Sequence, residues 1–268
     1  MKSQKKVILV TGASSGIGLA IAEYLAQNGH RVYGTSRSVK TNPLFTFLEM
    51  DVRDESSVKT AVQTVIEREN RIDLVVNNAG VGITGPLEET PLAEAKNHFD
   101  TNFFGAISVM QAVLPQLRKQ QSGLIINVTS IAGYMGLPFR GIYSAGKAAL
   151  EVLTEAVRLE TAQFNIKICN VAPGDFATNI ADRRYHAPVI ENSAYAKTYG
   201  ATLNEINSHV NSGSNPIEMA QAIEKIINTP EPKIHYKVGL FMQKFSIVLK
   251  RILPDLTYEK MLRRHFKL

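Results

Sequence analysis

A glycine-rich turn between an apolar run and a helical pattern constrains the fold of this chain more than any other feature. The apolar run at 7–10 leads directly into T-G-A-S-S-G-I-G at 11–18, and a helical pattern follows from about 16 to 27. Glycines permit a tight turn, close approach of a pyrophosphate and close packing of helix on strand. The helix N-terminus presents free N–H groups and a positive dipole end to phosphates. The spacing is G-x-x-x-G-x-G, not the archetypal G-x-G-x-x-G, and a simple strand–helix turn is the alternative.

Short β-rich runs alternate with longer helical patterns along most of the chain. Strands are predicted at 7–10, 31–36, 45–50, 72–76, 124–128 and 166–172, and helices at 16–27, 55–69, 99–117, 143–161 and 217–228. Because this alternation produces right-handed crossovers, it predicts an α/β fold with a parallel sheet covered on both faces. We find no linker or internal repeat, so a single domain over residues 1–268 is expected. The pattern loosens at 175–215, which we expect to form a substrate-binding loop or lid.

Composition excludes several classes of protein. Hydrophobic content of 44% and charged content of 20% are ordinary for a globular protein. The single cysteine, Cys169, lies in an apolar strand and cannot form a disulfide within the chain, which fits a reducing compartment. The six histidines show no ligand spacing, so no metal is expected. The N-terminal apolar run is too short for a signal peptide, and no stretch approaches the ~20 apolar residues of a membrane span, so a cytoplasmic protein is expected.

The net charge of +6 is concentrated in the last segment of the chain. Residues 233–268 contain nine Lys/Arg and two Asp/Glu (9 − 2 = +7), so the remainder sums to 6 − 7 = −1. No nucleic-acid reader motif appears, and no nucleic-acid partner is expected. At about 100° per residue, one helical face gathers Phe241, Met242, Phe245, Val248, Leu249, Ile252 and Leu253, with Ile247 outside it. This basic amphipathic extension either docks on the domain or a partner subunit, or contacts an anionic membrane surface peripherally.

The second predicted strand indicates which nucleotide binds. In dinucleotide folds an acid ~20 residues after the loop binds the ribose of NAD, and an arginine accommodates the 2′-phosphate of NADP. No Asp or Glu lies between Arg31 and Leu48, and Arg37 follows Gly18 by 19 residues. A guanidinium can bind a phosphate that a carboxylate would repel. NADP(H) is therefore the predicted cofactor, although Arg37 as a solvated surface charge is the alternative.

Tyr143 and Lys147 lie four residues apart, about one helical turn, so both project from one helix face. Free tyrosine titrates near pH ~10, and a fixed positive charge beside it lowers that pKa. Such a tyrosine can serve as a general acid/base. Ser130 lies 13 residues before Tyr143, at the end of a predicted strand, where its hydroxyl can polarise a carbonyl. The alternative for Ser130 is a turn-forming hydroxyl.

With these residues assembled, the chain resembles the short-chain dehydrogenase/reductase family. The resemblance covers about residues 7–178. The motifs that carry it are Thr11–Gly18, Asp51-Val52, Asn77-Asn78-Ala79-Gly80, Asn102, Ser130, Tyr143 with Lys147, and Pro173-Gly174 with Thr178. The resemblance implies a single-domain Rossmann-like, doubly wound parallel sheet of about seven strands. Leu137-Pro138-Phe139 and the basic extension look most like hydroxysteroid and retinol dehydrogenases. Gly146 departs from the serine or other small residue usual before the lysine.

The resemblance also implies roles for individual residues. Catalysis is expected from Asn102, Ser130, Tyr143 and Lys147, with Tyr143 as general acid/base and Asn102 holding a water that connects Lys147 to solvent. Cofactor contacts are expected from Gly12, Ser14, Ser15, Gly16, Ile17, Gly18, Arg37, Asp51, Val52, Asn78, Ala79, Gly80, Tyr143, Lys147, Pro173, Gly174 and Thr178. Among these, Asp51 contacts adenine in the family and Thr178 holds the nicotinamide carboxamide. A homodimer or homotetramer is expected.

These features predict an NADP(H)-dependent alcohol dehydrogenase or carbonyl reductase. The alternatives are a catalytically idle NADP-binding sensor or scaffold, which would need the loop but not the four catalytic residues, and a sugar epimerase or dehydratase, for which the chain is short. The residues expected to line the substrate pocket are Ile83, Met135, Leu137, Pro138, Phe139, Phe176 and Ile180. Because they are mostly apolar, they favour a lipophilic small-molecule carbonyl substrate, although such residues are often only core.

Overall fold

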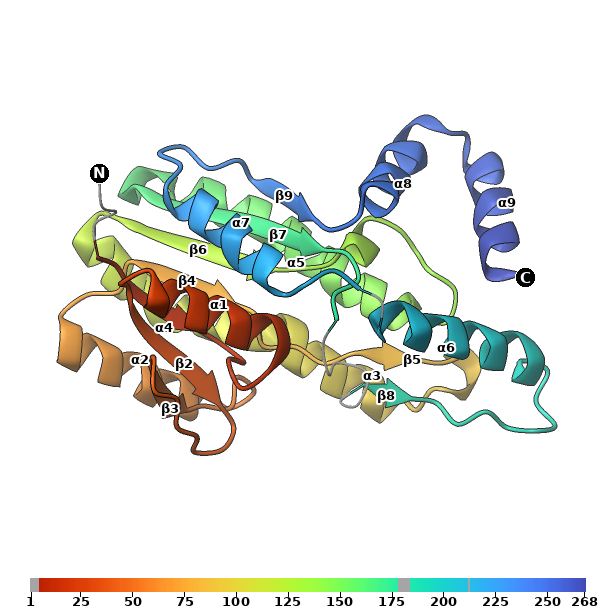
Figure 1. The fold of residues 1–268 in the computed structure, drawn as a ribbon, viewed down its shortest axis with the longest axis horizontal. Helices are drawn as coiled ribbons and strands as arrows, with labels where there is room; N and C mark the ends of the chain where they lie inside the picture. The colour runs from red at the N-terminus through yellow and green to blue at the C-terminus, as the bar shows by residue number, and fades with distance from the viewer. Residues whose placement is uncertain (1–4, 178–183, 212) are drawn as a thin grey trace.

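A parallel sheet forms the centre of the molecule (Figure 1). The computed structural model describes residues 5–177, 184–211 and 213–268. The strands of this sheet are β1 (Val7–Val10), β2 (Arg31–Ser36), β3 (Thr46–Glu49), β4 (Leu74–Asn77), β6 (Gly123–Val128), β7 (Ile166–Pro173) and β9 (His235–Val238). Their order is β3-β2-β1-β4-β6-β7-β9, and each neighbouring pair is parallel. The predicted doubly wound sheet of seven strands is therefore confirmed.

Helices cover both faces of the sheet (Figure 1). One face carries α1 (Gly16–Gln27) and α7 (Ile217–Ile227), and the other carries α2 (Glu55–Glu69), α4 (Gly105–Gln120) and α5 (Gly141–Thr161). The apolar run of β1 is buried on both faces of the sheet. Ile8 and Val10 pack into the core between the sheet and helices α1 and α7, and Val7 and Leu9 pack into the core between the sheet and helices α2, α4 and α5. A central parallel strand has no solvent face, so both sets of side chains are buried.

The helix predicted at 99–117 is longer than expected and is interrupted. It comprises α3 (Leu92–Phe99), a π-helical turn at Asp100–Phe104 and α4. Short 3₁₀ turns complete the connections at Leu87–Glu89, Ile131–Tyr134 and Ala162–Phe164. The π-helical turn contains Asn102, and such turns often occur at functional sites.

The segment expected to be a loop at 175–215 contains regular structure. It holds β8 (Tyr185–His186), which pairs in parallel with β5 (Ile83–Thr84), and the helix α6 (Ala196–Asn211). The buried face of α6 includes Tyr199, Thr202 and Ile206, which are spaced three and four residues apart. Two of these three residues carry a hydroxyl, so the apolar pattern that predicts a helix is weak here.

The C-terminal extension forms two helices, α8 (Phe241–Ile252) and α9 (Asp255–Phe266), of which the second was not predicted. Ile247, outside the predicted apolar face, is the residue of α8 that is buried, in a cluster with Ile131, Met135, Ala172 and Tyr258. Much of the predicted apolar face remains in solvent, including Phe241, Met242, Val248 and Ile252. The domain therefore covers only part of this face, and docking on a partner subunit or on a membrane stays a prediction. None of the described helices combines the length and apolarity needed to cross a bilayer.

Candidate active site

A continuous cleft of about 1340 Å³ runs along the carboxyl ends of the sheet strands. In open α/β sheets, ligands bind in this position because the loops after the strands converge there. The predicted cofactor-binding and catalytic residues within the described chain all line it. They are Gly12, Ser14, Ser15, Gly16, Ile17, Gly18, Arg37, Asp51, Val52, Asn78, Ala79, Gly80, Asn102, Ser130, Tyr143, Lys147, Pro173 and Gly174. Thr178 lies outside the described residues.

The turn after β1 has the shape that a dinucleotide pyrophosphate requires. Gly12 has a φ of +66°, and a Cβ there would lie 2.9 Å from the Ala79 Cα. Gly18 packs so closely on the Gly12 carbonyl that any side chain would collide with it. Ser15 precedes α1 without a side-chain cap, which leaves the first N–H groups of the helix open to an anion. The pyrophosphate of a nicotinamide dinucleotide therefore fits this turn.

Thr11 ties the turn to the segment after β4, a role that the sequence analysis did not assign. The Thr11 hydroxyl accepts hydrogen bonds from the backbone N–H groups of Asn78 and Ala79, at 3.0 and 2.9 Å. In return, the Asn78 side-chain amide donates to the Thr11 carbonyl at 3.0 Å. These contacts join the two loops into one rigid floor of the cleft.

The end of β2 presents positive rather than negative charge to the cleft. Thr35, Ser36, Arg37, Ser38 and Lys40 line it there, so none of the lining residues of this loop is acidic. Within the described residues, the exposed Arg37 forms no ion pair, whereas Asp51, after β3, binds Arg53 with an Nη2–Oδ2 distance of 2.7 Å. The hydrogen bond from Arg53 lowers the pKa of Asp51, and Arg37 adds to this effect. Arg37, rather than an acidic side chain, is thus available at this end of the cleft to bind an anion.

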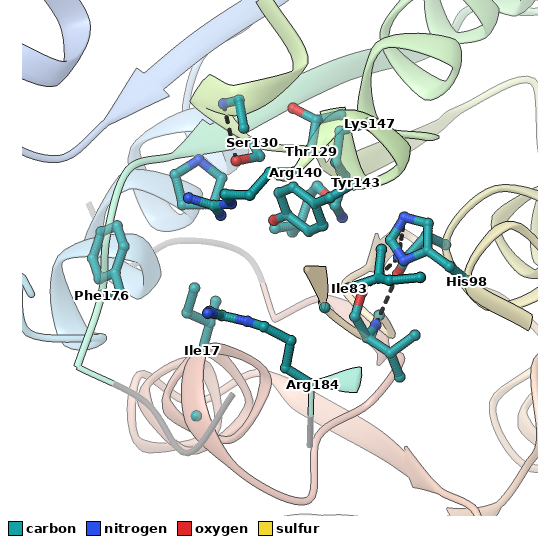
Figure 2. A pocket seen from close by; sticks show the side chains of 18 of the residues that line it. Ile17, Ile83, His98, Thr129, Ser130, Arg140, Tyr143, Lys147, Phe176 and Arg184 are labelled. Carbon is teal, nitrogen blue, oxygen red and sulfur yellow. Dashed lines mark hydrogen bonds between the residues drawn. The ribbon is translucent and has the colours of Figure 1, made fainter. Parts of the chain in front are cut away.

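Tyr143, Lys147 and Ser130 meet at the other end of the cleft (Figure 2). Helix α5 carries the first two, and Ser130 follows β6 and caps the turn at Ile131–Tyr134 by accepting from the Ala132 N–H at 3.1 Å. The Lys147 Nζ donates to the Val128 carbonyl at 2.9 Å. That contact anchors the ammonium against the end of β6, one helical turn from the tyrosine.

The charges around Tyr143 favour its phenolate. Burial alone raises the pKa of Tyr143, but Lys147, Arg140, a hydrogen bond with Ser130, and Arg184 act in the opposite direction and lower it below its usual value. For Lys147, burial lowers the pKa, and this effect exceeds those of Tyr143 and Glu151, which raise it. A tyrosine in this setting can exchange a proton nearer neutrality than a free tyrosine can.

Asn102 is held by the backbone of Val81. Its amide oxygen accepts from the Val81 N–H at 2.9 Å, and its nitrogen donates to the Val81 carbonyl at 2.8 Å. The same nitrogen lies 2.8 Å from Nδ1 of His98, a residue that the sequence analysis did not select. Burial and the charge of Lys147 lower the pKa of His98 to about 4, so it is neutral at pH 7.

His98 also explains the unusual glycine before the lysine. A Cβ at Gly146 would lie 3.0 Å from the His98 Nε2, and the His98 ring lies 5.7 Å from the Tyr143 ring. Gly146 therefore provides room for the histidine behind the tyrosine. A lone histidine 45 residues upstream of Tyr143 carries no sequence signal, and only the packing of α3 on α5 brings the two together.

The C-terminal extension also reaches the cleft. Gln243 of α8 donates through its side-chain amide to the Asp175 carboxylate at 2.8 Å and accepts from the Asp175 N–H at 3.3 Å. Gly174 packs directly against this side chain, so a side chain at position 174 would collide with it. Helix α8 thereby braces the segment after β7, where Pro173 and Gly174 face the cleft.

The apolar end of the cleft differs in part from the prediction. Ile83, Met135, Leu137 and Phe176 line it as predicted, and Ile180 lies outside the described residues. Pro138 and Phe139 are not among the lining residues, and the Phe139 ring packs instead against Tyr199 with ring centroids 5.3 Å apart. The lining residues that the sequence analysis did not assign to the cleft include Ile131, Arg140, Arg184, Ile206, Leu249, Met261, Leu262 and Phe266. The described residues contain no group of three or more His, Cys, Asp or Glu side chains placed to hold a metal.

Comparison with known proteins identifies the class of this protein. The short chain dehydrogenase family model matches residues 6–188. The chain is 41% identical to a 3-ketodihydrosphingosine reductase of Bacteroides thetaiotaomicron, over 94% of each chain. It is 31% identical to retinol dehydrogenase 8 of Bos taurus, over 89% of this chain and 83% of that protein. The crystal structure of a short-chain dehydrogenase from Streptomyces avermitilis is 32% identical and superimposes with a TM-score of 0.83, over 98% of this chain and 99% of that one.

The chain belongs to the short-chain dehydrogenase/reductase family, as its motifs predicted. It is an oxidoreductase of that family, acting on alcohol or carbonyl groups.

Proposed function

We propose that this protein is an NADP(H)-dependent reductase or dehydrogenase that interconverts a carbonyl and an alcohol on a lipophilic substrate. The observation that carries the proposal is the half-buried Tyr143, its pKa lowered by cationic neighbours, in the same cleft as the glycine turn. The chemistry that NADP(H) supplies when bound is hydride transfer, and the protein supplies orientation and the proton. A catalytically idle nucleotide sensor would have no use for this end of the cleft.

The proton chemistry follows from the positions of three side chains. In the direction of reduction, the Tyr143 hydroxyl donates its proton to the carbonyl oxygen of the substrate, and the phenolate accepts it back in the reverse direction. Lys147 stabilises the phenolate, and the Ser130 hydroxyl donates a hydrogen bond to the same substrate oxygen. Asn102 holds the π-helical turn against Val81 and, as in the family, would position a water that connects Lys147 to solvent.

The residues that would hold the cofactor follow the cleft from end to end. The turn at 12–18 and the N-terminus of α1 suit the pyrophosphate, and Tyr143 with Lys147 suit the nicotinamide ribose. Asp51, Val52, Asn78, Ala79 and Gly80 suit the adenosine, and Pro173, Gly174 and Thr178 suit the nicotinamide. Arg37, with no acidic residue among those that line the cleft from the loop after β2, supports NADP(H) over NAD(H).

A lipophilic substrate is supported by the apolar end of the cleft. Met135 and Leu137 lead from the site toward Leu249 of α8 and Leu262 of α9, which also line the cleft. A substrate chain placed along them would remove apolar surface from water, worth roughly 25 cal/mol per Å². The Bacteroides thetaiotaomicron relative is named for a lipid that carries a 3-keto group, 3-ketodihydrosphingosine, which agrees with this class of substrate.

The exposed face of α8 supports a peripheral contact with an anionic membrane. Phe241, Phe245, Val248 and Ile252 form a solvent-exposed stripe at helical spacing, and the two phenylalanine rings stack 5.7 Å apart. The segment at 233–268 carries a charge of 9 − 2 = +7. An apolar stripe with basic surroundings suits an anionic bilayer surface. Because α8 also lines the cleft, such a contact would place the cleft where a lipid substrate could enter.

A homo-oligomer is supported by a second exposed apolar surface. Val152 and Leu159 on α5 are largely exposed, and large exposed apolar side chains gathered on one helix suit contact with another subunit. We therefore propose that α5 contributes to a contact between two copies of the chain. Sedimentation velocity of the unmodified protein and of Leu159→Glu should show an assembly that the substitution dissociates.

The experiment that tests the proposed activity is an assay of NADPH consumption against ketones of increasing chain length, with Tyr143→Phe as the matched variant. The substitution keeps the ring and removes the hydroxyl. We expect turnover to fall by at least the ~10²-fold typical of a lost general acid. Binding of NADPH by Tyr143→Phe, measured by fluorescence, should persist. Near-normal turnover by the variant on a substrate of the unmodified enzyme would contradict the mechanism.

A further inference from the structure

We propose that Arg140 and Arg184 form a subsite for an anionic group of the substrate, such as a carboxylate, phosphate or sulfonate, beside the reacting carbonyl. This inference rests on the proposed function, because it specifies the substrate class of the same cleft. Arg140 precedes α5 and Arg184 precedes β8, so they approach from different elements. Figure 2 shows their guanidinium groups on either side of the space next to the Tyr143 hydroxyl.

Arg184 is a buried cation without a hydrogen-bond partner for one of its nitrogens. The residue is 9% exposed, and its buried Nη1 makes no hydrogen bond to any of the described residues. Burial and then the charge of Arg140 lower the pKa of Arg184. A buried charge is costly unless it is paired, so a guanidinium held in this position suits an anionic ligand.

The backbone beneath Arg184 is shaped to hold it in the cleft. Gly82 has no side chain, and a Cβ there would lie 2.7 Å from the Arg184 Cγ and 2.9 Å from its Nε. The side chain therefore lies flat against Gly82 and extends toward the centre of the cleft (Figure 2). This placement is built into the fold, since β5 and β8 pair in parallel immediately beside it.

The second guanidinium lies over the catalytic ring. The Arg140 Cζ is 5.0 Å from the centroid of Tyr143, and no ion pair involving Arg140 occurs within the described residues. Asp175 acts on Arg184 from a distance, but its carboxylate already accepts a hydrogen bond from Gln243. Among the described residues, no acid therefore makes a hydrogen bond or ion pair with either of these two guanidinium groups at the tyrosine.

These positions indicate the chemistry of the ligand. Two guanidinium groups can together bind carboxylate, phosphate or sulfonate oxygens, and they would repel an ammonium. Together with the apolar end of the cleft, they describe an amphiphile whose acidic group lies a few bonds from its carbonyl. Binding the anion would offset the positive charge at Tyr143, raise the pKa of its hydroxyl and keep it protonated for reduction.

The test compares an acidic ketone with its neutral form. The probes are 3-oxododecanoate and its methyl ester, and the measured quantity is the ratio of their kcat/KM values with NADPH. We expect the unmodified enzyme to prefer the acid by about tenfold or more, as charge-assisted contacts allow. Arg184→Gln and Arg140→Gln should each lower this ratio about tenfold. The exposed Arg118 on α4, outside the cleft, provides the control, and Arg118→Gln should leave the ratio unchanged.

The cofactor is a second source of the same anionic chemistry, and a binding measurement separates the two. Calorimetry should show that Arg184→Gln weakens binding of decanoate to the NADP⁺-saturated protein and leaves the dissociation constant of NADP⁺ nearly unchanged. If the variant weakens NADP⁺ binding and spares decanoate, the arginine serves the cofactor phosphates and the proposal is wrong. Equal rates on acid and ester would also overturn it, with the reductase activity intact. If neither ketone is reduced but decanoate binding depends on both arginines, the subsite stands and the proposed function fails.

Discussion

His98 and Gly146 pack against each other behind the Tyr143 ring, and we predict that substitutions at the two positions are strongly coupled. Replacing a helical glycine by alanine stabilises an exposed helix by ~1 kcal/mol. At Gly146, however, the new Cβ would lie 3.0 Å from the His98 Nε2. The His98 ring is buried and is in contact with Asn102, so it cannot move aside freely. Overpacking of this kind costs ~1–3 kcal/mol, so Gly146→Ala alone should destabilise by ~0–2 kcal/mol.

Removing the histidine should change the sign of the effect. In a His98→Ala background the obstacle is absent, and Gly146→Ala should stabilise the protein by about its helix propensity, ~1 kcal/mol. The double-mutant cycle then has a coupling free energy of ~1–3 kcal/mol, within the range for residues in direct contact. Urea unfolding measures it. With a slope of ~3 kcal/mol per M, a change of ~1 kcal/mol moves the midpoint by about 0.3 M.

The same helix supplies the control. Gly141 is the first residue of α5, and a Cβ there would meet nothing within 4 Å. Gly141→Ala should therefore have the same effect with and without His98. If Gly146→Ala also had equal effects in both backgrounds, the tight contact between the two residues would not exist in solution. A change in the urea slope would instead show that the unfolded or native ensemble had changed, and the cycle would need another probe.

Three further predictions concern the cofactor, the pH profile and the tail. Arg37→Asp should reverse a preference for NADPH over NADH of about tenfold or more, by calorimetry; equal affinities in the unmodified protein would rule out the NADP assignment. Reduction needs protonated Tyr143, so its rate should fall as pH rises through the lowered pKa of Tyr143, while oxidation should rise. Arg140→Gln removes a nearby positive charge and should move both limbs to higher pH; a downward shift would contradict this assignment. Replacing Phe241 and Phe245 by Asn should abolish salt-sensitive sedimentation with anionic vesicles without changing the fold, since both rings are exposed; if the unmodified protein does not bind vesicles at low salt, the membrane proposal fails.

The sequence was sufficient where the signal is local. The glycine turn, the alternation of strands and helices, and the one-turn spacing of Tyr143 and Lys147 are set by residues close together in the chain. Backbone geometry and helical period act over that same range. The sheet and the family were therefore predictable. So were most of the residues that converge on the cleft, because the loops after parallel strands meet at one edge.

Only the tertiary structure decided features that depend on which surfaces meet. Ile247 is buried and Phe241 exposed, although the helical pattern indicated the reverse, because packing against Met135 and Tyr258 selects a different face of α8. Helix α6 buries Tyr199 and Thr202, which carry little apolar periodicity. His98 and Arg184 reach the site from distant parts of the chain and follow no motif. Their contacts are long-range, and the free energy of such packing is not encoded in any short window of sequence.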